Sequence, residues 1–329
     1  MVYVHVPFCR SFCTYCDFYS ERACPSRSWV DEVCREARSR RNEIAATAAV
    51  DTLYFGGGTP SVLPLEYLGL IADACGGRNY AEWTVEVNPD DITPEYARGL
   101  RALGVNRVSM GVQSLDDGML RWMNRRHSAD GARRAFRLLR DAGFDNISVD
   151  VIFGISGLTA SMLESTLKEI LDWRPEHISA YQLSVEDGSA LADLVRKGRY
   201  TDLPDEECSA QYYLICRLLA DAGHEHYEIS NWARPGFRAI HNSAYWTRAP
   251  YVGLGPGAHS LSRTGVSEVR SWNSECLSGW TPESEVLTEE QIREERIMLG
   301  LRTAEGIPGY GRIPEDMWFV ADSIIAGLV

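Results

Sequence analysis

The sequence has no long apolar run and no excess of positive charge, and each absence argues against a class of protein. No segment approaches the roughly 20 consecutive apolar residues that cross a bilayer. The chain has 33 Lys and Arg against 46 Asp and Glu, a net charge of -13, which argues against nucleic-acid binding through a basic surface. The first residues carry neither a basic region nor a long apolar core, so we expect no signal peptide.

The cysteines do not form a disulfide framework. Nine are present in 329 residues, and those beyond the first loop are scattered: Cys24, Cys34, Cys75, Cys208, Cys216 and Cys276. This distribution indicates a reducing compartment, and we predict a cytoplasmic protein. The apolar share of 45% is ordinary for a globular core, and α/β barrels commonly reach this length as one unit.

Strand and helix patterns alternate over residues 1–200. Apolar strands are expected at 2–6, 51–55, 83–87, 107–112, 147–153 and 177–183, with helical patterns between them. This alternation is typical of parallel βαβ units, and polar residues gather at strand ends, where barrel enzymes place their sites. We predict an α/β fold, a partial (β/α)6 TIM-type barrel open on one side. An open Rossmann-type sheet is the competing interpretation, but no G-x-G-x-x-G follows the first strand.

The pattern loosens after residue 200. We divide the chain into a barrel over 1–200, a barrel-flanking region over 201–285 that is rich in glycine and aromatic residues, and a short C-terminal helical segment over 286–329. No low-complexity linker separates these parts.

Three cysteines follow the first strand in the spacing C-x3-C-x2-C: Cys9, Cys13 and Cys16. Three thiolates on one loop could bind a [4Fe-4S] cluster, which usually takes four, and leave one iron open for chemistry. A structural zinc that also uses His5 or Cys24 is an alternative, although zinc loops usually bring two separated ligand pairs. Ordinary buried thiols are the other alternative.

The loop resembles the radical S-adenosylmethionine signature, in which an aromatic residue precedes the third cysteine, as Tyr15 does here. The resemblance implies that S-adenosylmethionine binds the open iron. It also implies that the cofactor contacts residues at the strand ends: Tyr3, Tyr15, Gly57, Gly58, Thr59, Glu86, Gln113, Arg125 and Asp150. Carboxylates and amides can bind ribose hydroxyls and an ammonium, and arginine can pair with a carboxylate. Taken singly, Glu86 or Asp150 could instead be a buried carboxylate paired within the barrel.

Most of the chain is similar to the oxygen-independent coproporphyrinogen oxidase family, and within it to the HemW-type heme chaperones. The oxidases have a fourth cysteine one residue beyond the third ligand, where this chain has Phe18. The chaperones have an H-N-x-x-Y-W motif, matched here by His241, Asn242, Tyr245 and Trp246. Histidine is a common heme ligand, and aromatic side chains can cover a porphyrin face.

These motif residues have other interpretations. His241 could be a core histidine with two packed aromatic residues, and Cys24 or His259 could hold the heme iron instead. We expect the motif to line a surface cleft that is separate from the cluster. The family's C-terminal domain resembles a winged-helix unit, and its middle is missing after Glu305.

The resemblance implies a heme chaperone with a [4Fe-4S] cluster, S-adenosylmethionine and heme. It implies heme delivery to respiratory acceptor proteins, including membrane-bound ones, from a position in the cytoplasm or at the inner membrane face. It also allows a homodimer. The alternatives are oxidative decarboxylation of coproporphyrinogen III and a radical methylase that degrades heme.

Overall fold

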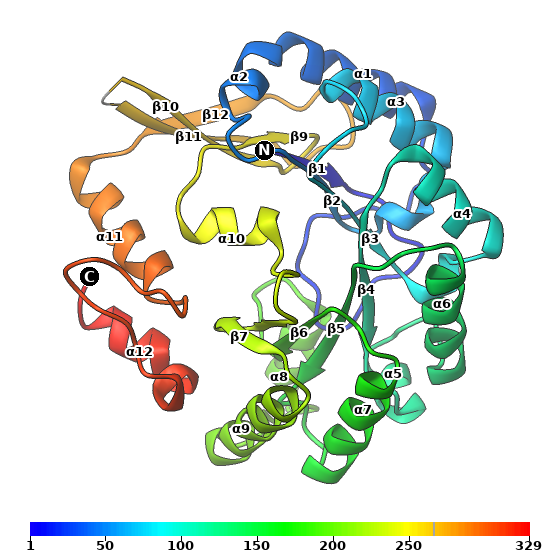
Figure 1. Ribbon diagram of the computed structural model, residues 1–329, viewed down its shortest axis with the longest axis vertical. Coiled ribbons are helices and arrows are strands. Elements are labelled where there is room, and N and C mark those ends of the chain that lie inside the picture. The colour runs from blue at the N-terminus through cyan, green and yellow to red at the C-terminus, as the bar shows by residue number, and fades with distance from the viewer. Residues whose placement is uncertain (266) are drawn as a thin grey trace.

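The computed structural model describes residues 1–265 and 267–329. Six parallel strands lie side by side in chain order and form the main part of one curved sheet (Figure 1). They are β1 (Val2–Val6), β2 (Thr52–Gly57), β3 (Glu82–Val87), β4 (Arg107–Gln113), β5 (Ile147–Phe153) and β6 (His177–Gln182). A doubly wound sheet would reverse its strand order, and this one does not, so the predicted partial barrel is confirmed over the Rossmann alternative.

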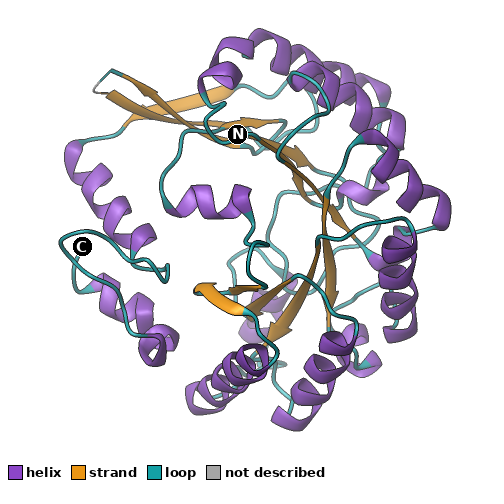
Figure 2. Ribbon diagram, viewed as in Figure 1, coloured by secondary structure: helices purple, strands orange, loops and turns teal. Residues whose placement is uncertain are grey.

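Helices cover the outer face of the sheet (Figure 2). They are α1 (Arg27–Ser39), α2 (Arg41–Ala46), α3 (Leu65–Cys75), α4 (Pro94–Leu103), α5 (Asp117–Trp122), α6 (Ala129–Asp141), α7 (Ala160–Asp172), α8 (Ala190–Arg196) and α9 (Asp205–Asp221). Several begin at a side-chain cap that the sequence supplies. Ser26, Thr93 and Thr159 each accept a hydrogen bond from a backbone N–H in the first turn of α1, α4 and α7.

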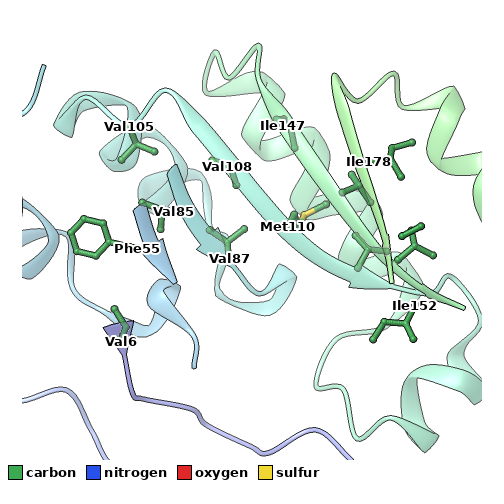
Figure 3. Packing of buried hydrophobic residues seen from close by; sticks show 14 of the residues in the cluster. Val6, Phe55, Val85, Val87, Val105, Val108, Met110, Ile147, Ile152 and Ile178 are labelled. Carbon is green, nitrogen blue, oxygen red and sulfur yellow. The ribbon is translucent and has the colours of Figure 1, made fainter. Parts of the chain in front are cut away.

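The two faces of the sheet differ because side chains alternate along each strand. On β4, Val108, Met110 and Val112 are fully buried in the apolar core, while Arg107 and Ser109 line the inside of the barrel. Figure 3 shows part of the apolar core, including Phe55, Val85 and Met110. The apolar side chains on one face of the sheet pack against the helices. The side chains on the other face make the interior of the barrel polar.

Residues after 200 extend the same sheet at both edges. β8 (Asn231–Ala233) pairs antiparallel with β6 and with β7 (Glu225–Glu228), whereas β9 (Val252–Leu254) pairs parallel with β1. The region predicted to flank the barrel therefore also contributes strands to it.

Between these added strands, α10 (Ile240–Trp246) lies across the inside of the curved sheet (Figure 1). The Glu82 carboxylate accepts hydrogen bonds from the backbone N–H groups of Ile240 (2.8 Å) and His241 (2.9 Å). Because Glu82 begins β3, α10 lies at the amino end of the barrel, opposite the cysteine loop. We call this end of the barrel the floor and the cysteine-loop end the rim.

A small antiparallel sheet and two helices complete the described chain. The sheet contains β10 (His259–Thr264), β11 (Ser267–Asn273) and β12 (Pro282–Val286), and α11 (Glu289–Gly300) and α12 (Ala321–Ala326) follow it. Buried Arg248 pairs with Glu268 at 2.8 Å and Glu295 at 3.0 Å, which joins the small sheet to α11. In the described part of the chain, no helix has the length and apolar character needed to pass through a bilayer.

Candidate functional site

A cavity of about 1070 Å3 occupies the inside of the barrel from rim to floor. Its size is at the upper end of typical ligand pockets, which reach about 1,000 Å3. It is lined by every residue for which the sequence predicted a binding role: Tyr3, Cys9, Cys13, Tyr15, Cys16, Gly57, Gly58, Thr59, Glu86, Gln113, Arg125, Asp150, His241, Asn242, Tyr245 and Trp246. One cavity thus connects the two predicted sites, which lie at its opposite ends.

The three cysteines of the first loop lie at the rim and are partly buried. Cys9 Sγ is 3.3 Å from Thr59 Oγ1, and Arg125 Nη1 donates to Cys13 Sγ at 3.3 Å. Burial, with smaller contributions from the nearby Cys13 and Cys9, raises the pKa of the Cys16 thiol to about 11. Thiolates held on this loop would need a positive partner, and a metal cluster would supply one.

The spacing of these thiols bears on the zinc alternative. Over residues 1–265 and 267–329, no three His, Cys, Asp or Glu side chains are close enough together to hold one metal ion. A cubane cluster uses one thiolate on each of three irons, so its ligands can lie farther apart. The loop therefore fits a cluster better than a single zinc ion.

The glycines after β2 hold the cysteine loop against the sheet. Gly58 N–H donates to Val6 O at 2.8 Å. A β-carbon on Gly58 would come within 2.9 Å of Phe8 O and Val6 O, and within 3.1 Å of Cys9 Sγ. Gly58 is expected from the sequence to contact the cofactor, whereas an added β-carbon would collide first with the protein's own loop. The missing side chain thus lets the cluster loop approach β2.

Arg125 lies behind the cysteine loop and is only partly satisfied. Its Nη2 donates to Gly111 O at 2.7 Å, and its buried Nε has no hydrogen-bond partner among the described residues. The buried Oε1 of Gln113 also lacks a described partner, and Gln113 has a backbone φ of 65°, where the β4–β5 register shifts. A strained residue and unpaired polar atoms on a cavity wall are typical of a ligand site.

The two predicted carboxylates are held by hydroxyl groups. Tyr54 OH donates to Glu86 Oε1 at 2.7 Å, and burial raises the pKa of Glu86 to about 7. Ser109 Oγ lies 3.2 Å from both carboxylate oxygens of Asp150, and burial raises the pKa of Asp150 as well. Neither carboxylate has a described ion-pair partner, so both can accept further donors from a ligand.

The H-N-x-x-Y-W segment forms α10 at the floor. His241 is 1% exposed, so the predicted surface cleft is wrong: the motif faces the inside of the barrel. Its Nδ1 bonds to Thr52 Oγ1 (2.8 Å) and its Nε2 to Tyr245 OH (3.0 Å), and its ring stacks on Tyr54 with centroids 5.0 Å apart. Burial lowers the pKa of His241 to about 3, so the imidazole is neutral, as a metal ligand must be.

Cys24 and His259, the alternative candidates for a heme ligand, lie outside the cavity. Cys24 is exposed, and His259 lies on β10, where its ring stacks on Trp272. Neither of them is part of the cavity lining.

Several cavity residues were missed from the sequence. Buried Glu228 and fully buried Arg107 both face the cavity. Arg107 begins β4, the end of a barrel strand at which catalytic residues are not expected. The only available signal was a charged residue at an inward position of an apolar strand.

The residues present fit both groups that the cysteine motif implies. Three thiols converge beside an arginine, a glycine keeps that loop close to the sheet, and unpaired Arg125 and Gln113 atoms face the adjoining space. Cys9, Cys13 and Cys16 would hold the cluster. The walls formed by Gly57, Glu86 and Asp150 would hold the cofactor.

Comparison with known proteins identifies the family. Residues 3–170 match the model of the radical SAM superfamily, whose cofactors are a [4Fe-4S] cluster and S-adenosylmethionine. The chain is 36% identical to the heme chaperone HemW of Bacillus subtilis, over 93% of this chain and 84% of that protein. It is 35% identical to HemW of Mycobacterium tuberculosis (strain H37Rv), over 93% and 82% of the two chains.

The fold is shared with a solved structure. Coproporphyrinogen III oxidase (HemN) from Escherichia coli superposes with a TM-score of 0.71 at 21% identity, over 92% of this chain and 75% of that chain. The predicted relationship is confirmed: the chain belongs to the radical SAM superfamily and, within it, to the HemW family.

Proposed function

We propose that this protein is a heme chaperone that binds heme in the barrel cavity and transfers it to acceptor proteins. One observation carries the proposal: the H-N-x-x-Y-W helix lines the same cavity as the cluster thiols. Relatives that are 35–36% identical to this chain are named heme chaperones. Phe18, 66% exposed at the rim, occupies the position of the oxidases' fourth cysteine and favours the chaperone over the decarboxylase.

We assign the cluster and the cofactor to the rim of the cavity and the porphyrin to its floor. When bound, the cluster and S-adenosylmethionine supply one-electron chemistry at the rim. Glu86 and Asp150 would bind the cofactor's polar groups from the wall. Tyr245 and Trp246 would cover one face of the porphyrin, and burying that apolar surface would supply most of the affinity, at about 25 cal/mol per Å2.

The iron ligand requires a local rearrangement. Both ring nitrogens of His241 are hydrogen-bonded, so Nε2 can bind iron only after Tyr245 OH moves away. The bond from Nδ1 to Thr52 Oγ1 would then orient the ring, as outer partners orient metal-binding histidines. We propose His241 as the axial ligand and Tyr245 as the group that covers it in the heme-free protein.

Two variants test this assignment. His241→Gln should shift the Soret band and raise the heme dissociation rate, because the iron–imidazole bond is lost. Tyr245→Phe should keep the wild-type band and bind heme more tightly, because nothing then competes for Nε2. His259→Ala serves as the control. If His241→Gln kept the wild-type spectrum and affinity, the ligand assignment would be wrong.

A separate assay addresses the enzymatic alternative. Reduced, cluster-loaded protein should form no protoporphyrinogen from coproporphyrinogen III in the presence of S-adenosylmethionine. Steady product formation would overturn the chaperone proposal.

We further propose that the acceptors include membrane-bound respiratory proteins and that transfer occurs at the cytoplasmic face of the membrane. The names of the relatives support heme as the cargo. A transfer assay from heme-loaded protein to membrane vesicles that contain an apo-cytochrome tests it, and no transfer above that from free heme would contradict it.

A further inference from the structure

We propose that Arg107, at the floor of the cavity, binds a propionate carboxylate of the heme and so orients the porphyrin with its acidic edge toward the amino end of the barrel. This inference rests on the proposed function. It assigns a role to a residue that lies outside every motif identified in the sequence.

Arg107 is a buried cation with few partners. It is 1% exposed and lines the cavity. Its one described hydrogen bond runs from Nη1 to Thr84 Oγ1 at 3.5 Å, and its buried Nε has none. Guanidinium groups stay protonated in proteins, so an unpaired charge is held inside the barrel. Burying such a charge is unfavourable unless an anion pairs with it.

The nearest carboxylates form no described ion pair with Arg107. Glu82 uses its two oxygens on the backbone N–H groups of Ile240 and His241. Asp150 accepts from Ser109 and lies within the field of Arg107 without a described ion pair. The guanidinium group of Arg107 thus keeps free N–H donors. A ligand's carboxylate can accept hydrogen bonds from them, ideally as a bidentate pair.

The other buried arginine among the described residues is paired: Arg248 contacts two carboxylates. Two buried histidines also lie within the field of Arg107. His177 and His241 have lowered pKa values because of burial, with the charge of Arg107 adding to that effect. An anionic group is therefore the ligand chemistry that this end of the cavity favours.

Arg107 also lies far from the rim, where the cofactor would bind. Arg107 and Gln113 are the two ends of β4, and a seven-residue strand spans roughly 20 Å. A carboxylate bound to Arg107 lies far from the cluster loop, so the methionine carboxylate of a rim-bound cofactor is not the expected partner.

The test compares heme with its dimethyl ester, in which both propionates are neutral. Wild-type protein should bind heme on the order of tenfold to a hundredfold more tightly than the ester, the range expected for a charge-assisted hydrogen bond. In Arg107→Met this preference should fall to near unity, and Arg107→Lys should restore part of it. Titration by absorption measures each affinity, and thermal unfolding shows that each variant is folded.

Arg302→Met is the matched control, because Arg302 lines the same cavity but donates to Asp322 at 2.7 and 2.9 Å. It should keep the wild-type preference for heme over the ester. Equal binding of heme and ester by wild-type protein would overturn the role of Arg107 while leaving the chaperone proposal intact. An unchanged preference in Arg107→Met would do the same. If wild-type protein bound neither compound, both proposals would fail. The ester comparison in wild-type protein decides the matter even if Arg107→Met does not fold.

Discussion

The rim and the floor of the same cavity differ in how their polar side chains are hydrogen-bonded. At the rim, polar atoms such as Arg125 Nε and Gln113 Oε1 lack described partners, and the three thiols of the cysteine loop line the cavity. At the floor, both ring nitrogens of His241 on α10 are hydrogen-bonded within the protein, although Arg107 Nε lacks a described partner. The rim therefore presents unpaired polar atoms to a ligand. At the floor, His241 can bind iron only after its hydrogen bond to Tyr245 is broken.

Two carboxylates on β3 show the same contrast. Glu82, at the floor, accepts two backbone N–H groups and caps α10. Glu86, four residues closer to the rim, accepts a described side-chain hydrogen bond from Tyr54 and has a pKa raised to about 7 by burial. The floor carboxylate stabilises the fold, and the other one is held ready for a ligand.

The largest expected effect is loss of the cluster. Cys9→Ala, Cys13→Ala or Cys16→Ala should each remove most iron and labile sulfide from reconstituted protein, because one iron loses its protein ligand. Cys24→Ala, which changes an exposed thiol outside the cavity, should retain both. Iron and sulfide analysis measures the effect. Loss of the cluster in Cys24→Ala alone would show that the ligand set is wrong.

The next effect concerns stability against pH. The folded-state pKa of Glu86 is about 7 against 4.5 for the free group, so the folded protein retains a proton that the unfolded chain releases. The contribution of Glu86 to stability should therefore fall as pH rises from about 4.5 to about 7, by at most about 3 kcal/mol, since water in the cavity screens the charge. Buried histidines such as His127 and His241, whose pKa values burial lowers, contribute in the opposite direction over this range.

Glu86→Gln removes this contribution, so the slope of stability against pH should be more positive in the variant than in wild-type protein. Glu228, whose pKa burial also raises to about 7, keeps its own contribution in both proteins. Glu82→Gln is the control: it should lower stability at every pH, since it weakens the cap of α10, and keep the slope. Urea unfolding of the cofactor-free protein at several pH values provides the measurement. An unchanged slope in Glu86→Gln would contradict the assignment.

The smallest effect should come from one methyl group at the rim. Gly58→Ala places a β-carbon against Phe8 O and Val6 O, so the cysteine loop must shift. Overpacking of this kind costs about 1–3 kcal/mol, and we expect S-adenosylmethionine affinity to fall about tenfold, with some loss of iron.

Gly131→Ala in α6 is the matched control, because a β-carbon there has its nearest neighbour at 3.6 Å. Calorimetric titration of the cluster-loaded proteins compares the two variants. Equal affinities in Gly58→Ala and wild-type protein would remove this glycine from the site.

The sequence predicts what is local and periodic. Period-two strands, helical spacing and the C-x3-C-x2-C loop each depend on neighbours in the chain, and the six strands and the rim follow from them. The floor depends on contacts across the chain: His241 bonds to Thr52, 189 positions away. No local pattern encodes that distance, which is why the motif was expected on a surface.

Arg107 and Gly58 illustrate the same limit. A charged residue at the start of β4 and a glycine in a turn have many local interpretations. Their roles depend on which groups come close in space: Arg107 Nε has no hydrogen-bond partner among the described residues, and Phe8 O lies close to Gly58. Such contacts depend on packing rather than on pattern.

The order of the strands has a consequence for synthesis. Because β1 to β6 are neighbours in chain order, each can join the growing sheet soon after it is made. The α10 helix is synthesised later, and His241 on it bonds to Thr52 and Glu82, 189 and 159 positions away. The barrel should therefore remain open at its floor until residue 246 has emerged from the ribosome. During that interval, the cysteine loop can be reached from both ends of the nascent barrel.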